Sequence, residues 1–408
     1  MIVLRAYKTE LDLNNTQRVI CQRHAGAARF AYNWGLAQKM AAYQAGEKVP
    51  SAIDLHRRLN ALKQTELSWL YEVSKCAPQE ALRNLDCAYA NFFRRVKQKK
   101  AGKKVKAGFP RFKSKKKNRD SFRLTGIIHI FENAIQLPRL GRLRLKERGY
   151  LPTENARVLS ATVSQRARHW FVSLQVEQEI PGSRLAEDRP VVGVDLGIHR
   201  LAQLSDGTVF ENPNALRSSL KKLRRLNRAL SRKKRGGTNF QKALLRLGRE
   251  NARIANIRKD TLHKITTRLA KTKSVVVLED LNLNGMVKNH KLALSIFDAG
   301  MYEFRRQMEY KGKWYGCELI LADRFFASTK RCSNCGAVKS IMGLEERVYH
   351  CDYCGEVIDR DLNAAINLEQ WWTNPIVRKL RRVSPKVTPA ESSEDLSIQA
   401  ALVEAGTE

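Results

Sequence analysis

Residues 190–197 read Pro-Val-Val-Gly-Val-Asp-Leu-Gly, and residues 273–279 read Lys-Ser-Val-Val-Val-Leu-Glu. Both runs are short, apolar and rich in β-branched residues, which is the pattern of strands buried inside a sheet. A helical stretch of about 217–272 lies between them, either as one long helix or as a pair broken at Gly236-Gly237. This alternation of strand and helix predicts an α/β domain around the two apolar runs.

Each apolar run ends in an acid, Asp195 in the first and Glu279 in the second, and a third acid, Asp361, opens the helical segment 363–368. A carboxylate at the end of a buried strand is unfavourable unless a cation lies beside it. Three converging carboxylates would bind divalent metal, and two Mg²⁺ ions about 3.5–4 Å apart are suited to the hydrolysis of a phosphodiester. The sequence therefore offers a candidate catalytic site.

The same acids also have structural interpretations. A single acid at a strand end is more often a turn cap or an ion-pair partner, and Asp352 and Asp359 compete with Asp361 as the third ligand. Asp359 is well placed as a helix N-cap, which favours Asp361 as the inward-facing acid. Asp206 and Asp280 are expected in turns. The spacing alone leaves both the metal site and the structural interpretation open.

Four of the eight cysteines are close in the sequence, as Cys332-Ser-Asn-Cys335 and Cys351-Asp-Tyr-Cys354, and a glycine follows each pair. Two such pairs, with fifteen residues between them, predict a zinc ribbon in which four thiolates bind one tetrahedral Zn²⁺. Because the protein fills all four ligand positions, we expect the zinc to be structural. The alternative, two unconnected redox pairs, lacks a thioredoxin-like context.

The charge of the chain points to a polyanionic partner. The 408 residues include 75 Lys and Arg against 40 Asp and Glu, a net charge of +35, and 43% of them are hydrophobic. The apolar content excludes disorder of the whole chain. No apolar run reaches the roughly 18 residues of a membrane span, and no signal segment is visible. We therefore expect nucleic acid as the partner, no membrane association, and a location in the cytoplasm of a prokaryotic cell.

The basic residues gather in two runs. Residues 94–119 hold 14 Lys and Arg and no acid, and residues 221–259 hold 15 with one acid, Glu250. We expect the first run to be a loop rather than a packed element. The aromatic residues beside it could stack on bases, although anchoring such a loop in the core is the commoner role. These aromatic residues are Phe92, Phe93, Phe109 and Phe112.

The rest of the chain divides by pattern. A strand is predicted at 2–7, helices over about 16–93, and six short alternating runs between 121 and 177 that indicate an antiparallel barrel or meander. We expect the first strand to join that sheet, which makes the helical region an insertion. Residues 181–190 predict a linker, 290–314 a helix and 317–322 a strand.

Together these motifs resemble TnpB, the OrfB-type family of transposon-encoded RNA-guided nucleases, and by extension the compact type V CRISPR effectors. The matching stretches begin at Ala28-Arg-Phe-Ala-Tyr-Asn-Trp, Gly108-Phe-Pro-Arg-Phe-Lys, Leu137-Pro-Arg-Leu-Gly, Gly193-Val-Asp-Leu-Gly-Ile, Leu278-Glu-Asp-Leu-Asn, Met286-Val-Lys-Asn, Leu292-Ala-Leu-Ser, Cys332-Ser-Asn-Cys-Gly, Cys351-Asp-Tyr-Cys-Gly and Asp359-Arg-Asp-Leu-Asn-Ala-Ala. The acidic tail and the loop at 46–51 have no counterpart.

The resemblance implies a multidomain α/β protein with a β-barrel. Its parts would be a wedge-like β-barrel (1–8 and 115–183), a helical recognition domain with a basic loop (9–114), a split RuvC domain of the RNase H fold (190–328 and 356–378), a zinc ribbon inserted in it (329–355) and a disordered acidic tail (379–408). Asp195, Glu279 and Asp361 fall on the family's catalytic metal ligands. Lys75 and Gln79 lie where the family contacts the DNA motif beside its target.

The function that the resemblance implies is Mg²⁺-dependent, RNA-guided cleavage of double-stranded DNA next to a short transposon-adjacent motif. A guide RNA derived from the transposon end would pair with the target strand, while the protein recognises shape, backbone and motif. One chain per guide RNA, about two Mg²⁺ and one Zn²⁺ are expected. The alternatives are a non-cleaving RNA- and DNA-binding regulator of transposition, with structural acids, and a strand-joining transposase, whose His-x-His and Tyr arrangement the sequence does not offer.

Overall fold

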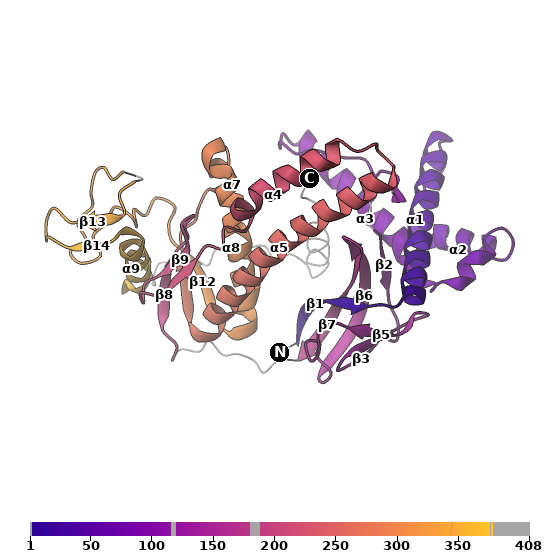
Figure 1. Cartoon of the computed structure of the whole chain (residues 1–408), viewed down its shortest axis with the longest axis horizontal. Coiled ribbons are helices and arrows are strands. Elements are labelled where there is room, and N and C mark those ends of the chain that lie inside the picture. Colours follow the sequence, from indigo (N-terminus) through magenta and orange to yellow (C-terminus); the bar gives the residue numbers. More distant parts are fainter. Residues whose placement is uncertain (1, 116–119, 180–187, 344, 376, 378–408) are drawn as a thin grey trace. The chain divides into compact units, whose positions relative to one another are not determined.

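The computed structural model describes residues 2–115, 120–179, 188–343, 345–375 and 377 (Figure 1). The predicted acidic tail and most of the predicted linker lie outside these residues. The chain divides into two compact units: Met1–Gly182 with Ser219–Ala255, and Ser183–Ser218 with Asn256–Glu408. We call them unit 1 and unit 2. No helix among the described residues combines the length and the apolar character needed to cross a membrane.

Unit 1 contains a seven-stranded antiparallel sheet. In chain order its strands are β1 (Ile2–Asp12), β2 (Ser121–Leu124), β3 (His129–Phe131), β4 (Ala134–Leu137), β5 (Gly141–Leu145), β6 (Ala156–Arg166) and β7 (His169–Glu179). They lie in the order β2-β6-β7-β1-β5-β4-β3. The sheet is antiparallel as predicted, but β2–β6, β7–β1 and β1–β5 are neighbours that are not consecutive in the chain, so it is not a simple meander. Among the described strands, pairing ends at β2 on one side and at β3 on the other, so closure into a barrel stays a prediction.

The first strand joins this sheet, as predicted. It pairs with β7 from Ile2 to Leu11 and with β5 at Leu11 and Asp12. It is five residues longer than the predicted end at Tyr7, because alternating burial continues to Leu11, whose side chain is buried in the core. The helices that follow are therefore an insertion between β1 and β2, beside the sheet in Figure 1.

The insertion consists of α1 (Asn15–Gln44), α2 (Ala52–Leu62) and α3 (Cys76–Lys100), with a short 3-10 helix at Ser68–Glu72. The side chains of Asn14 and Ser51 cap the first two helices, each in a reciprocal capping box. The helix α3 continues into the first basic run, so the predicted loop is wrong for residues 94–100. Lys and Arg are good helix formers, and all five in this segment remain exposed on the helix.

The rest of the basic run, up to residue 114, has no regular helix or strand, as expected. The ring of Phe109 packs edge-on against Tyr89 and Phe92, with ring centroids 5.5 and 5.4 Å apart. Phe92 also packs against Phe93, with ring centroids 5.2 Å apart, so these contacts attach the basic loop to α3, although Phe109 keeps 45% of its surface exposed. Phe93 and Phe112 instead leave 56% and 55% of their surface exposed, so these two rings remain accessible.

Unit 2 contains a five-stranded mixed sheet. Its strands are β8 (Val191–Asp195), β9 (Arg200–Leu204), β10 (Val209–Glu211), β11 (Val275–Leu278) and β12 (Glu318–Leu321), in the order β10-β9-β8-β11-β12. The three strands β8, β11 and β12 are parallel, while β9 and β10 complete the sheet antiparallel to their neighbours. The short strand β10 is not part of the sequence prediction.

The remaining helices are α4 (Ala215–Ser231), α5 (Thr238–Thr272), α6 (Leu283–Met286), α7 (His290–Ala299), α8 (Met301–Tyr315) and α9 (Arg360–Thr373). The break between α4 and α5 falls at Gly236-Gly237, as one of the two predicted alternatives has it. The predicted helix at 290–314 is two helices, because Gly300 adopts a left-handed conformation with φ of 69°.

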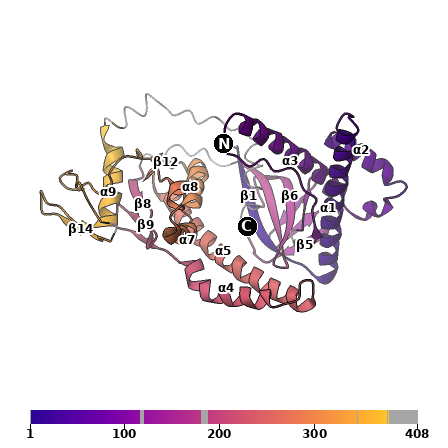
Figure 2. The same cartoon turned by 90° about the horizontal axis from the view of Figure 1, so that it is seen from above.

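Helices cover both faces of the sheet in unit 2. Val276 and Leu278 of β11 pack into a core with residues of α5 and α8, whereas Val275 and Val277 pack with Leu368 of α9. Figure 2 shows α9 and α8 on opposite sides of β8. This arrangement gives the α/β domain predicted from the two apolar runs.

Candidate metal centres

Asp195 and Glu279 lie at the same edge of the sheet in unit 2. Asp195 is the last residue of β8, and Glu279 directly follows β11. These strands are parallel neighbours, with Leu278 opposite Val194. Because the carboxyl ends of parallel strands meet at one edge, the fold places the two acids beside each other, although 83 residues separate them in the sequence.

The helix α9 brings the third acid to the same face. Side chains alternate between the faces of a sheet, so Asp195 shares its face with Gly193. A Cβ atom at Gly193 would lie 2.0 Å from the backbone oxygen of Ala365, so α9 packs directly against β8 at this glycine. Asp361 lies in the first turn of α9. Three acids from distant parts of the sequence therefore meet on the α9 side of the sheet.

Asp359 has the role of helix cap that the sequence predicts. Its Oδ1 accepts hydrogen bonds from the backbone N–H groups of Asp361 and Leu362, at 3.0 and 3.1 Å. Its Oδ2 pairs with the guanidinium of Arg200 at 2.9 Å. Both oxygens of Asp359 thus have partners. Of Asp359 and Asp361, only Asp361 is therefore a candidate to join Asp195 and Glu279 as a metal ligand. Its carboxylate also lies 3.4 Å from the guanidinium of Arg360.

The electrostatics of the three acids show that they interact. Burial raises the pKa of Asp195 well above its ordinary value, and the neighbouring carboxylates of Glu279 and Asp361 raise it further. Burial also raises the pKa of Glu279. The hydroxyl of Ser328 donates a hydrogen bond to Oε1 of Glu279 and partly opposes this rise. Burial is the largest cause of both raised pKa values, and a bound cation would oppose it by favouring the ionised carboxylates.

This donor set fits a divalent cation such as Mg²⁺, which prefers carboxylate oxygens as ligands. The three acids are not drawn together as tightly as the cysteines are. Within the described residues, the four cysteines are the one group of at least three His, Cys, Asp or Glu side chains whose ligand atoms all lie within 4.8 Å of one another.

Asp206 and Asp280, the two acids expected in turns, have other partners. Asp206 accepts a hydrogen bond from the backbone of Thr208 at 3.0 Å and pairs with Lys273 at 2.7 Å. Asp280 pairs with Arg305 and Arg324, at 3.1 and 2.7 Å. Neither has a carboxylate left over for a metal, so the structural interpretation holds for both.

The four predicted cysteines form a compact cluster. The Sγ atoms of Cys332 and Cys354 are 3.7 Å apart, and those of Cys335 and Cys351 are 3.5 Å apart. A tetrahedron with Zn–S distances of about 2.3 Å has sulfur–sulfur edges of about 3.8 Å, so the cluster fits one Zn²⁺ and not a disulfide. Backbone N–H groups of Cys354 and Tyr353 lower the pKa of Cys351 to about 6, which favours the thiolate that a metal binds.

The two halves of the ribbon have the same backbone design. The backbone N–H of Gly336 donates to the carbonyl of Cys332, and that of Gly355 donates to the carbonyl of Cys351. Both glycines have positive φ, 79° and 74°, as the tight turn behind each ligand pair requires. Strands β13 (Val348–His350) and β14 (Val357–Asp359) pair behind the second turn. These features are consistent with a structural zinc site.

Amide side chains of α9 connect the ribbon to the acidic face, and the sequence analysis does not single them out. Asn363 donates to the carbonyl of Arg331 at 2.7 Å and accepts from the backbone N–H of Ser333 at 2.9 Å. Asn367 donates to the carbonyls of Ser328 and Arg331, at 2.9 and 2.6 Å. The segment leading into the first cysteine pair is therefore attached to the helix that carries Asp361.

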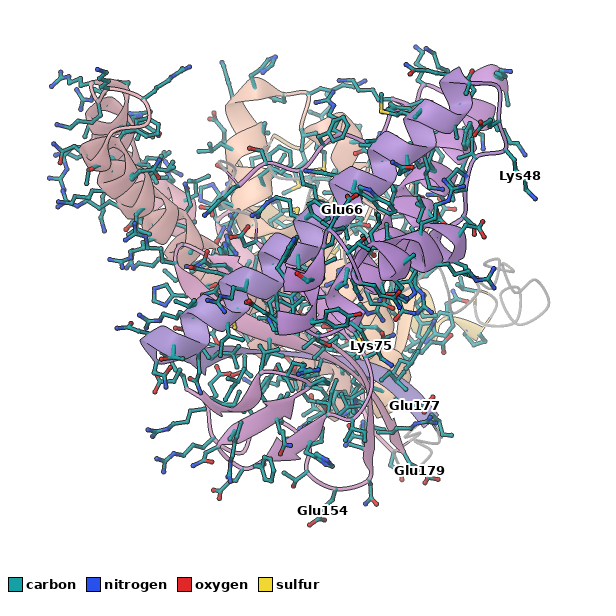
Figure 3. The ribbon with its side chains drawn as sticks, turned by 90° about the vertical axis from the view of Figure 1, so that its right-hand side faces the viewer. Lys48, Glu66, Lys75, Glu154, Glu177 and Glu179 are labelled. Atoms are coloured by element: carbon teal, nitrogen blue, oxygen red, sulfur yellow. The ribbon has the colours of Figure 1, made fainter. Side chains whose placement is uncertain are left out.

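The residues predicted to contact a DNA motif lie in unit 1. Lys75 directly precedes α3 and is exposed, where Figure 3 labels it, and Gln79 lies one helical turn later. Burial and then the charge of Lys75 lower the pKa of Lys63, and burial and the charges of Lys63, Arg83 and Lys75 lower that of His56. This concentration of positive charge at the start of α3 is suited to an anion.

Solved structures similar to this chain come from compact CRISPR effectors. The "Cryo-EM structure of the Cas12f1-sgRNA-target DNA complex" covers 92% of this chain and all of that chain, with 16% identity and a TM-score of 0.34. The "Structure of the mini-RNA-guided endonuclease CRISPR-Cas_phi3" covers 90% of this chain and 92% of that chain, with 9% identity and a TM-score of 0.45.

Three family models match parts of the chain. They are a helix-turn-helix domain of OrfB_IS605 at residues 1–48, the OrfB_IS605 model described as "Probable transposase" at 171–290, and the Cas12f1-like TNB domain at 302–368. In the structure the first range begins with β1 and contains one long helix, α1. The third range contains the four-cysteine ribbon, from α8 into α9.

Two relatives match over most of their length. The protein of Streptomyces pristinaespiralis named "Putative RNA-guided DNA endonuclease" is 38% identical over 90% of this chain and 89% of its own length. InsQ of Escherichia coli (strain K12), which bears the same description, is 35% identical over 90% of this chain and 91% of its own length. With the predicted motifs in place and identity of this extent, the chain belongs to the TnpB (OrfB/IS605) family of RNA-guided DNA endonucleases.

Proposed function

We propose that this protein is a Mg²⁺-dependent RNA-guided DNA endonuclease that cuts double-stranded DNA next to a short transposon-adjacent motif. The observation that carries the proposal is the meeting of Asp195, Glu279 and Asp361 on the α9 side of one sheet, with the raised pKa of Asp195. Carboxylates that are buried close together at one edge of a sheet are costly to fold, and a bound divalent cation would offset that cost.

In this proposal Asp195, Glu279 and Asp361 would hold the metal, and the chemistry that a bound metal would supply is activation of water and stabilisation of charge on the leaving 3′ oxygen of the phosphodiester. The protein supplies the remaining requirements. Ser328 holds one oxygen of Glu279, and Asp359 caps the helix that presents Asp361. The contact at Gly193 sets the distance of that helix from β8. The zinc cluster, with four protein ligands, has no open position for water and supports the fold only.

The strand order of the sheet in unit 2 supports an RNase H-like, RuvC-type domain. Three strands form an antiparallel meander, two further parallel strands follow, and helices cover both faces. The first acid ends the first strand of this sheet and the second acid follows the fourth, in keeping with the resemblance. We also infer that the sheet in unit 1 is the wedge-like barrel of the family, with the helical insertion as its recognition domain.

Guide RNA from the transposon end and target DNA are the proposed partners, with one chain per guide RNA. Support comes from the exposed basic residues of α4 and the end of α3, and from the charge near Lys75. Phosphate contacts from such surfaces give affinity without sequence preference, which suits a protein whose specificity comes from RNA pairing. Lys75 and Gln79 are the proposed readers of the adjacent motif.

Plasmid cleavage tests the proposal. Supercoiled plasmid carrying a matched target is incubated with protein, guide RNA and Mg²⁺, and linear product is expected for the wild type. Asp195→Asn should bind guide RNA normally and give no product, and EDTA should have the same effect on the wild type. Asp280→Asn is the matched control. It makes the same chemical change at an acid that pairs with two arginines and is not a proposed metal ligand, so this variant should still give linear product.

Two outcomes would count against the proposal. Equal cleavage by Asp195→Asn and wild type would remove the acids from catalysis. Intact plasmid under every condition, with guide RNA and DNA still bound, would instead favour the non-cleaving regulator of transposition.

A further inference from the structure

The segment between β12 and the first cysteine pair contacts a proposed metal ligand directly. Ser328 lies in this segment, and only 1% of its surface is exposed. Its hydroxyl donates a hydrogen bond to Oε1 of Glu279, which is 49 residues away in the sequence. A carboxylate with one oxygen held by a donor has its plane and its free oxygen fixed. Ser328 is therefore placed to control how Glu279 faces a metal.

Ser328 is held in turn by α9. Asn367 is 1% exposed, and its Nδ2 spans two carbonyls, those of Ser328 and Arg331. Its Oδ1 is buried without a hydrogen-bond partner among the described residues. The position of this amide is thus determined by its two donated bonds. The backbone N–H of Ser328 also donates to the carbonyl of Phe326 at 2.9 Å, which fixes the serine from the other side.

The same contacts reach the zinc cluster. Arg331, whose carbonyl accepts from both Asn363 and Asn367, directly precedes Cys332. The backbone of Ser333, directly after that cysteine, is bound to Asn363. A continuous set of hydrogen bonds therefore connects the first ribbon turn, α9 and Glu279.

We propose that Ser328 is a positioning residue for Glu279 and that Asn367 is a positioning residue for Ser328. Through Ser328 and Asn367, the zinc ribbon and α9 set the orientation of Glu279, the proposed metal ligand directly after β11. The inference rests on the proposed function in one respect, that Glu279 binds the divalent metal. It adds a role for the ribbon segment in metal affinity, beyond holding Zn²⁺.

Asn363 provides a matched control. It lies one turn before Asn367 on the same helix, has the same side chain and donates to the same carbonyl of Arg331, but its bonds reach Ser333 and not Ser328. Removing either amide should loosen the ribbon to a similar degree. Only removal of Asn367 should free Ser328, so a difference between the two variants separates positioning of Glu279 from general loss of structure.

The test measures metal binding in the full-length protein without RNA, using Mn²⁺ as the probe in electron paramagnetic resonance titrations. Zinc content is determined on the same samples, and the Mg²⁺ concentration for half-maximal cleavage is measured with guide RNA added. Ser328→Ala and Asn367→Ala should each retain zinc and weaken Mn²⁺ binding about tenfold, as loss of a partner of a metal ligand typically does. Asn363→Ala should bind Mn²⁺ within about twofold of wild type.

The double variant Ser328→Ala/Asn367→Ala adds a second criterion. If both residues act on Glu279 in series, the double variant should bind Mn²⁺ no more weakly than the weaker single variant. Additive losses would show two independent effects and overturn the series. Unchanged Mn²⁺ affinity in both single variants, an equal loss in Asn363→Ala, or no Mn²⁺ site in the wild type would overturn the inference itself.

Failure of the proposed function gives a different pattern. If the wild type binds Mn²⁺ and the two single variants weaken that binding, but matched plasmid stays intact, the positioning pair stands and the cleavage activity does not.

Discussion

The raised pKa of Asp195 shows how one residue of the proposed metal site lowers the stability of the fold. A carboxyl whose pKa is raised on folding stabilises the fold while it is protonated, and this contribution is lost as the pH rises through the raised pKa. The ordinary value for Asp195 is 3.8, and burial with the charges of Glu279 and Asp361 moves it well upward. Above the raised pKa, the metal-free protein therefore holds the Asp195 charge at the expense of stability.

Asp195→Asn should consequently stabilise the metal-free protein. Its side chain is uncharged at every pH, so its melting temperature in EDTA should exceed that of the wild type by a few degrees at about pH 7.5, since about 1 kcal/mol corresponds to roughly 2–4 °C in a domain of this size. The difference should shrink as the pH falls through the raised pKa of Asp195 and the wild-type carboxyl becomes protonated. Calorimetry checks this, and a lower melting temperature for the variant would contradict it.

Gly193 is a second residue whose side chain decides the geometry of the site, because α9 packs where a Cβ atom would lie. A Cβ there would meet the backbone of α9 at 2.0 Å, and backbone cannot move aside as a flexible side chain can. Gly193→Ala should displace α9, destabilise the protein by roughly 1–3 kcal/mol or more, and abolish cleavage. Chemical denaturation measures the loss. Gly26→Ala in α1, where the nearest atom is 4.0 Å away, is the control and should be neutral or stabilising.

Among the elements, the zinc ribbon makes the clearest prediction. Its core contains few residues, mainly Cys332, Tyr349 and Cys351, so the metal must supply most of its stability. Cys335→Ser should reduce zinc from about one ion per chain to near none. Mass spectrometry of the metal content tests this, with Cys87→Ser, an exposed cysteine outside the cluster, as the control. Full zinc retention in Cys335→Ser would refute the four-thiolate site.

Glu250, the one acid of the basic run 221–259, joins the helices α4 and α5. Glu250 of α5 is buried and pairs with Lys222 of α4 and with Arg253, the latter at 3.4 Å. The hydrogen bond from Lys222 lowers the pKa of Glu250, so its contribution to stability is present above its ordinary pKa of 4.5 and is lost as the pH falls through the lowered value. The helices should be firmly paired at neutral pH.

Glu250→Gln should therefore loosen this pair of helices at neutral pH. Hydrogen–deuterium exchange in α4 should become several-fold faster, because Lys222 loses its charged partner. The wild type should show similar loosening only in acid, as the pH falls through the lowered pKa of Glu250. Unchanged exchange in the variant would assign the pairing of the helices to their apolar contacts alone.

The elements differ in how far the sequence could predict them. The apolar runs of β8 and β11 and the cap at Asp359 are local signals, and they led to the correct strands and helix. The dense positive charge of residues 94–100 predicts a loop, and this prediction is wrong because exposed Lys and Arg are good helix formers. Ser328 and Asn367 carry no local signal, since their bonds join residues 49 and 39 positions apart.

The charge of the whole molecule governs how it binds nucleic acid. With a net charge of +35, affinity for guide RNA should fall by roughly a thousandfold or more between about 50 and 200 mM salt, as six to ten phosphate contacts would require. Replacing Arg224 and Arg225 of α4 with Gln should reduce the slope of affinity against salt by about one per lost contact. Filter binding measures the slope. Lys48→Gln, outside both basic runs (Figure 3), should leave it unchanged.

The place of α9 in the chain has a consequence for synthesis. The strand that carries Asp195 leaves the ribosome well before residue 361, and at about 5–20 residues per second the delay is on the order of ten to thirty seconds. During that time the nascent protein can fold its first sheet and bind polyanions through its basic helices, but it lacks the third carboxylate. On the proposed function, ribosomes that stall or release early within this interval would produce fragments that carry the basic helices but lack the third proposed metal ligand.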